Sequence, residues 1–281
     1  MTNFENISGS RMERVYDRVY EHYKESTEHF SVHSIVGCFL QGSQNYNLDT
    51  KDSDVDTKLI VVPTFKDICV CKKPISHTHV RENNEHIDFK DIRLYMETFR
   101  KQNINFVEIL FTSFCYVNPM YEKDWSILVK NREGIARMNE VRAVKAMYGM
   151  ALEKYHAMEH RYPSKADIID NYGYDGKQVS HLLRVEDFMR RYINGEQYKD
   201  CLIPSPGIKQ KLLDYKALNV YSVEEARVEA EESLNRIKTM VDNFVFSKEE
   251  KENEYYKDML TEVSYNIMRL SAIRELEGES V

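Results

Sequence analysis

The sequence predicts an α/β lobe followed by an all-α lobe, because its strand-like segments are confined to the first half of the chain. Short apolar runs that favour β-structure lie at 34–41, 54–62 and 85–90, whereas apolar residues recur only at helical spacing after residue 137. With 281 residues, the chain exceeds the length of one typical domain. We therefore expect an α/β domain over residues 1–137 and a helical domain over residues 138–281.

The first lobe should begin with a helix over residues 12–30, since Val15 and Val19 share one helical face. Further helices of this lobe are predicted near 91–102, 106–113 and 121–137. We expect His77-Thr78-His79 to form a loop. Cys69 and Cys71 are interpreted as small buried side chains on a strand.

The second lobe carries helical periodicity throughout. Helices are predicted near 138–160, 176–194, 208–216 and 222–246. Ser222 and Glu225 have the spacing of a capping box, which marks a helix start. From Lys248 onward, apolar residues such as Leu260 and Ile267 indicate one more helix, docked on the rest of the chain.

Two carboxylates at the start of the second strand are the strongest chemical signal. Asp54 and Asp56 project to the same side, because side chains alternate along a strand. Two adjacent like charges repel unless a cation compensates them. Mg²⁺ suits this position, since it binds one or two carboxylates and fills its shell with water and phosphate oxygens. We expect Mg²⁺ or Mn²⁺ here.

A Gly-Ser turn precedes these carboxylates. After the apolar run 34–41, Gly42 and Ser43 can turn backbone N–H groups and a hydroxyl toward a phosphate. Taken alone, either motif would be structural in most proteins. Together they indicate a site for a metal ion and a nucleotide.

The order of these motifs resembles the nucleotidyltransferase superfamily of DNA polymerase β. More narrowly, the chain is similar to the predicted bacterial and phage nucleotidyltransferases that include RNA-ligase-associated members. Four later segments resemble that narrower family in the same order: 91–94, 101–105, 108–110 and 174–184. The resemblance covers the chain from about Ser34 to about Ile237.

The resemblance implies a catalytic lobe with a mixed sheet, followed by a helical lobe. It also implies metal-dependent transfer of a nucleoside monophosphate from a nucleoside triphosphate to a hydroxyl, with release of pyrophosphate. The implied metal ligands and catalytic residues are Asp54, Asp56 and Asp88, with Asp88 completing the site of a second ion. The implied nucleotide-binding residues are Gly42, Ser43, Gln44, Ser53, Lys177, His181 and Arg184. The spacing of His181 and Arg184 is equally compatible with a helix pair that is purely structural, either on the surface or buried with its polar groups satisfied.

Several residues depart from the family pattern. Gln44 stands where relatives often carry Arg, Asn47 where Gly is common, and Ile104 replaces the usual Pro. His86 falls where the narrower relatives often have the third Asp. Asp88 lies two residues later on the same strand face and has the apolar neighbours of the superfamily strand, so we select Asp88, with Asp91 and Glu85 as further candidates.

These departures keep alternative functions open. One is a protein of the same fold that binds nucleotide or a partner protein without turnover. Another is a structural or interaction protein in which Asp54 and Asp56 only solubilise the end of a strand.

Composition restricts the partners. A net charge of −7 argues against extended duplex DNA, which needs many Lys and Arg contacts to phosphates. Because the chain has no apolar run of membrane-spanning length and no signal-peptide pattern at Met1, we expect a cytoplasmic protein with no membrane partner. Five scattered cysteines do not suggest a disulfide framework or a zinc site. The acceptor stays open among a small molecule, a protein and an RNA end.

Overall fold

A five-stranded mixed sheet forms the centre of the α/β part in the computed structural model, which describes residues 9–30, 33–50 and 53–278. The strands are β1 (Ser34–Gln41), β2 (Asp56–Val62), β3 (Ser76–Val80), β4 (His86–Asp91) and β5 (Cys115–Val117), in the order β3-β4-β2-β1-β5. β2 and β4 run parallel, and the other neighbouring pairs are antiparallel. The predicted fold class, an α/β part with a mixed sheet followed by an all-α part, is confirmed.

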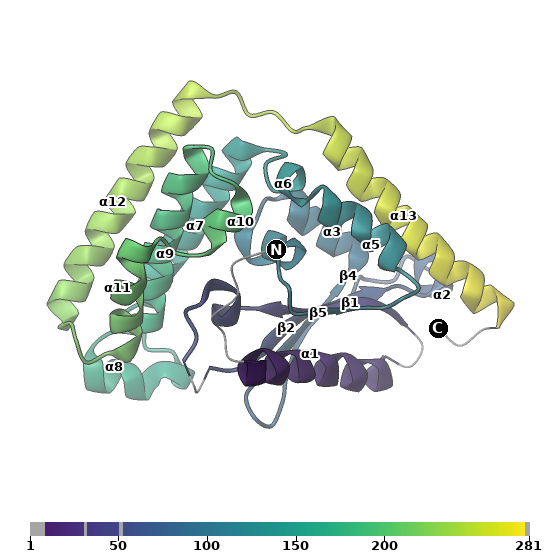
Figure 1. Ribbon diagram of the computed structural model, residues 1–281, viewed down its shortest axis with the longest axis horizontal. Helices are drawn as coiled ribbons and strands as arrows, with labels where there is room; N and C mark the ends of the chain where they lie inside the picture. The colour runs from purple at the N-terminus through teal and green to yellow at the C-terminus, as the bar shows by residue number, and fades with distance from the viewer. Residues whose placement is uncertain (1–8, 31–32, 51–52, 279–281) are drawn as a thin grey trace.

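The two faces of the sheet pack against different helices (Figure 1). Leu59 and Val61 of β2 belong to the core under α1 (Gly9–His29), together with Val15 and Val19. Ile60 on the same strand joins the larger core on the other face. Asp56 has the parity of Ile60, so the alternation of β2 directs it away from α1.

Three helices cover the face opposite α1: α3 (Ile92–Arg100), α5 (Glu122–Lys130) and α13 (Glu254–Glu277) (Figure 1). α13 contacts α3, α5 and the short α2 (Phe65–Cys69), burying Leu260 and Ile267. The predicted docked helix is therefore confirmed. Its N-cap is Asn253, whose side chain accepts a hydrogen bond from the Tyr255 N–H.

Every described element after β5 is helical. The helical part comprises α7 (Glu140–Ala157), α8 (Ala166–Tyr172), α9 (Gly176–Ile193), α10 (Tyr198–Leu202), α11 (Pro206–Ala217) and α12 (Val223–Ser247). Shorter helices are η1 (Ser43–Tyr46), α4 (Ile104–Val107), η2 (Glu108–Leu110), α6 (Arg132–Ile135) and η3 (Pro163–Lys165). The capping box at Ser222 and Glu225 starts α12 as predicted.

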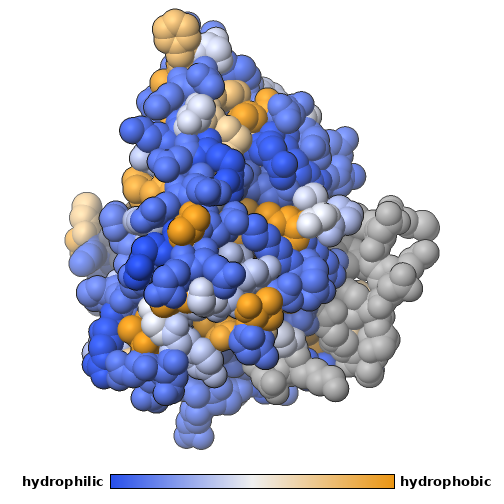
Figure 2. All heavy atoms as spheres, turned by 90° about the vertical axis from the view of Figure 1, so that its left-hand side faces the viewer, coloured by the Kyte–Doolittle hydropathy of each residue, from blue (hydrophilic) through white to orange (hydrophobic). Residues whose placement is uncertain are grey.

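The outer face of the helical part is mainly hydrophilic, and its hydrophobic residues lie in small separate patches (Figure 2). The apolar faces of α7, α9 and α12 point inward instead, into a core that continues to β1 and β2. The division into domains at residues 137 and 138 stays a prediction, and α13 lies against the α/β part. No helix in the described ranges is long and apolar enough to span a membrane.

Two local interpretations of the sequence are wrong. His77 and His79 lie on the edge strand β3 rather than in a loop, and all five residues of β3 are exposed, so no alternation of apolar residues announces the strand. Cys69 and Cys71 are exposed at and just after the end of α2, where Cys71 has a φ of 49°, rather than buried on a strand.

Candidate functional site

A pocket of about 450 Å³ gathers most of the residues that the sequence singled out. It lies where the turn after β1 and the start of β2 face α9. The lining residues are Gln41, Gly42, Ser43, Gln44, Tyr46, Thr50, Ser53, Asp54, Asp56, Asn105, Glu108, Lys177, His181, Arg184 and Lys216. All seven predicted nucleotide-binding residues are among them, as are Asp54 and Asp56.

The carboxylate edge of the pocket comes from Asp56, the first residue of β2, and from Asp54, which precedes the strand. The Oδ1 atom of Asp56 accepts hydrogen bonds from the His86 backbone N–H at 2.9 Å and from His86 Nδ1 at 3.1 Å. Asp54 is exposed, and its carbonyl accepts a 2.5 Å hydrogen bond from the Gln44 side chain. Gln44 is buried and thus ties the turn to the carboxylate segment.

The turn after β1 requires unusual backbone angles. Gly42 has a φ of 97°, a value that side-chain-bearing residues rarely adopt, and Asn47 ends η1 with a φ of 56°. The departure at Asn47 is therefore compatible with the turn, because Asn is among the few non-glycine residues that enter the left-handed region. Ser43 begins η1 and lines the pocket.

One face of α9 supplies the opposite, basic wall. Asp175 caps this helix by accepting a 2.9 Å hydrogen bond from the Lys177 N–H. Lys177, His181 and Arg184 then follow at spacings of four and three residues, which places them along one face. The wall deepens along the helix, from exposed Lys177 through half-buried His181 to buried Arg184.

Arg184 is the deepest cation of the pocket. Only 4% of its surface is exposed, and its guanidinium lies 3.9 Å from the centre of the Tyr46 ring. Its Nε has no hydrogen-bond partner. Burying a guanidinium N–H without a hydrogen-bond partner costs free energy of folding. An anionic ligand that accepted a hydrogen bond from this group would offset that cost.

Glu108 lines the same pocket as Arg184, and the sequence did not predict it as a site residue. It is 3% exposed and accepts a hydrogen bond from the Tyr46 hydroxyl. Burial raises the pKa of its carboxyl to about 8, although Arg184 and the Gly42 N–H both act to lower it. Its segment belonged to the family resemblance, but an isolated glutamate in an apolar run gives no sign of lining a pocket.

Lys216 of α11 was also missed, and a close helix contact explains its position. A Cβ on Gly176 would lie 1.9 Å from the Tyr215 carbonyl oxygen, so only glycine lets α9 approach α11 this closely. The contact brings Lys216 into the pocket, where its Nζ donates a 2.7 Å hydrogen bond to the Leu48 carbonyl. Burial, together with the charges of Lys177 and Arg184, lowers its pKa to about 8.

His181 carries little charge of its own. Burial holds the pKa of its ring well below the usual value, and the nearby Arg184 and Lys177 charges act in the same direction. The ring is therefore neutral at physiological pH, and the positive charge on this side of the pocket comes from Lys177 and Arg184 of α9 and from Lys216 of α11.

The third predicted carboxylate does not join this pocket. Asp88 pairs with Lys58, whose Nζ lies 3.3 Å from Oδ2, and the Thr78 hydroxyl donates to Oδ1 at 3.3 Å. The two further candidates are engaged as well: Asp91 caps α3 and binds Arg93. Glu85 binds Arg18, His22 and Arg81.

These positions limit how a metal ion fits. Asp54 and Asp56 share the pocket, and two carboxylates completed by water and phosphate oxygens suit Mg²⁺ or Mn²⁺. Across the part of the chain that the structure describes, no group of three His, Cys, Asp or Glu side chains could hold a metal by itself. A metal ion held by Asp54 and Asp56 would therefore take its remaining ligands from water or phosphate oxygens.

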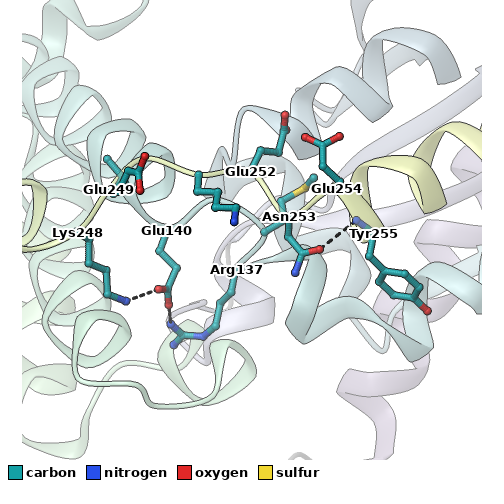
Figure 3. Close-up of a pocket in the computed structure, with 11 residues that line it drawn as sticks. Arg137, Glu140, Lys248, Glu249, Glu252, Asn253, Glu254 and Tyr255 are labelled. Carbon is teal, nitrogen blue, oxygen red and sulfur yellow. Dashed lines mark hydrogen bonds and ion pairs between the residues drawn. The ribbon is translucent and has the colours of Figure 1, made fainter.

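A second pocket, of about 650 Å³, lies at the connection between α12 and α13 (Figure 3). Two of its cations are already paired, since Glu140 binds both Arg137 and Lys248. No residue predicted from the sequence lines it. None of its lining residues is a buried cation with an unpaired N–H group, which Arg184 is in the pocket at β2.

Comparisons with known proteins give little beyond this geometry. No protein-family model matches the chain, and no curated protein matches it. Among solved structures, the chain is similar to a nucleotidyltransferase-like protein from Exiguobacterium sibiricum 255-15, with 12% identity over 95% of this chain and 92% of that chain, at a TM-score of 0.29. A likeness this weak carries no argument, and the functional interpretation rests on the pocket.

Proposed function

We propose that the pocket binds a nucleoside triphosphate with Mg²⁺ or Mn²⁺ and transfers its nucleoside monophosphate to a hydroxyl acceptor. The observation that carries the proposal is the pairing of opposite charges in one pocket. Asp54 and Asp56 form one edge, and Arg184, with its partnerless Nε, forms the deep end of the other. A complex of a triphosphate with a divalent cation needs both kinds of charge, because carboxylates bind the cation and basic groups bind the phosphate oxygens.

The phosphate chain would lie between the turn and α9. Ser43 can donate its hydroxyl, while Lys177, Lys216 and Arg184 supply positive charge to the phosphate oxygens. A bound divalent cation would add Lewis-acid stabilisation of the reacting phosphoryl group. In the transfer, the acceptor hydroxyl would lose its proton to solvent and its oxygen would form a bond to the α-phosphorus, while the bond from the α-phosphorus to the bridging oxygen breaks and pyrophosphate leaves.

The sequence resemblance supports this reaction class, and the acceptor remains any hydroxyl of a small molecule, a protein or an RNA end. One observation favours the alternative of binding without turnover. Asp88, the residue expected to complete the catalytic set, is held by Lys58 outside the pocket. In that case the protein would bind nucleotide, and no acceptor would be modified.

Label transfer distinguishes the two functions. Purified protein is incubated with each α-labelled nucleoside triphosphate, Mg²⁺ or Mn²⁺, and a host-cell extract. Transfer predicts label in an acceptor fraction together with released pyrophosphate, and loss of both in Asp56→Asn. Nucleotide binding without either product in the wild type would support the binding protein instead.

A further inference from the structure

The pairing of β2 with β4 determines how many carboxylates can share a metal ion. In this parallel pair Lys58 lies beside Asp88, and the His86 N–H donates to Asp56, so His86 is level with Asp56. Asp88 therefore lies two residues farther along the strand, about 7 Å away by strand geometry. The position beside Asp56 holds an imidazole, not a carboxylate.

A cation of the protein already occupies the Asp88 carboxylate. Lys58 is 5% exposed, and its ammonium lies 3.3 Å from Asp88 Oδ2 and 4.3 Å from the centre of the Phe106 ring. The ammonium of Lys90 lies 4.9 Å from the same ring. Two fixed positive charges at this point repel any further cation, and the remaining oxygen of Asp88 accepts the Thr78 hydroxyl.

We infer that the site binds one divalent cation, at Asp54 and Asp56, and that the Lys58 ammonium on Asp88 excludes a second. This inference rests on the proposed function, because it concerns the metal of that same pocket. It departs from the sequence-based expectation, in which Asp88 completes the site of a second ion. Lys58 is a positioning residue here, since it acts on the metal site through Asp88.

The number of bound ions tests the inference without requiring activity. Mn²⁺ is titrated into the full-length protein with a triphosphate analogue whose α,β-bridge is a methylene group, and free Mn²⁺ is measured by electron paramagnetic resonance. We expect one Mn²⁺ per chain in the wild type. Asp88→Asn should leave both the number and the affinity unchanged within about twofold, whereas Asp56→Asn should abolish tight binding.

Lys58→Met releases the Asp88 carboxylate and should admit a second Mn²⁺, whereas one ion in this variant would overturn the role of Lys58. If Lys58→Met does not fold, Asp88→Asn carries the test alone. Two ions in the wild type, falling to one in Asp88→Asn, would overturn the inference and leave the proposed function intact. No Mn²⁺ bound at all in the presence of bound analogue would instead refute the metal dependence of the proposed function.

Discussion

Glu108 is a buried carboxyl group whose ionisation is unfavourable in the folded protein. Its carboxyl is neutral over much of the physiological range, because burial outweighs the attraction of Arg184. The folded state therefore keeps a proton that the unfolded chain releases at a lower pH. Because Glu108 contacts Gly42 in the turn after β1, its charge state would also affect the proposed binding of an anion in the pocket.

The pH dependence of stability follows from that proton. The pKa of Glu108 rises from 4.5 in the unfolded chain to about 8 in the fold, so the folded state binds more protons between these values. Stability is consequently lost as the pH rises from 4.5 to 8, at up to about 1.4 kcal/mol per pH unit from this group. Glu108→Gln should flatten this decline in urea unfolding at pH 5.5, 7 and 8.5. Parallel curves for both proteins would contradict the assignment.

Ser43 tests the phosphate contact at the turn. Ser43→Ala should weaken binding of a triphosphate by about 1–2 kcal/mol, the loss expected for a hydrogen bond to a charged group. Ser76→Ala on the exposed strand β3 is the matched control and should leave affinity unchanged. Equal affinities of all three proteins in calorimetric titration would move the phosphate site away from the turn.

At the level of elements, the contact between α9 and α11 decides whether Lys216 belongs to the pocket. Gly176→Ala places a methyl group against the Tyr215 carbonyl and should destabilise the fold by about 1–3 kcal/mol, as overpacking does. It should also weaken triphosphate binding, because the helices must separate. Thermal unfolding and calorimetric titration measure the two effects.

Gly207 offers a control on the neighbouring helix. A Cβ at this position meets no atom within 4 Å, so Gly207→Ala should be neutral or slightly stabilising and should leave binding unchanged. If both variants behave alike, the close approach of α9 and α11 does not position Lys216.

The elements also show what the sequence could predict. Asp54 and Asp56 line one pocket although β2 begins only at Asp56, and Lys177, His181 and Arg184 line it from α9 at the helical spacing seen in the sequence. These patterns are local and follow from the period of each element. The contributions of Glu108 and Lys216 depend on how separate elements pack, which no local period encodes.

The exposure of β3 and the surroundings of Asp88 have the same physical origin, because both depend on how the strands pair in the sheet. β3 is an exposed edge strand, so burial imposes no pattern on its residues. The selection of Asp88 relied on its apolar neighbours, and it could not anticipate that the register of β2 against β4 sets Lys58 beside it. Which strands pair, and in which register, depends on the tertiary fold and cannot be inferred from the local sequence.

At the scale of the whole molecule, a continuous core joins the sheet to the helical part, and α13 lies back across α3 and α5. We therefore expect one cooperative unfolding transition. Fluorescence of Trp125, the single tryptophan, reports on the α/β part, while far-ultraviolet circular dichroism reports mainly on the helices. The two urea curves should coincide. Separate midpoints would show that the predicted domains unfold independently.

Docking of α13 should contribute to that single transition. Ile267 is fully buried against the core, so Ile267→Ala should cost about 2–5 kcal/mol and shift both curves together. Tyr265→Ala, on the exposed side of the same helix, is the control and should shift neither. A shift of the circular dichroism curve alone would contradict the coupling.

If the proposed function is right, the pocket at β2 binds a triphosphate through a metal ion. Calorimetry tests this most directly, by comparing the binding of a non-hydrolysable triphosphate analogue, with Mg²⁺ and with chelator, to the wild type and to the Asp54→Asn, Asp56→Asn double variant. Asparagine keeps a hydrogen-bond acceptor for His86, so stability in chelator should stay within about 0.5 kcal/mol of the wild type. We predict binding that requires Mg²⁺ in the wild type and is at least tenfold weaker in the double variant. Equal binding by both proteins, or binding by the wild type that is indifferent to Mg²⁺, would contradict the account.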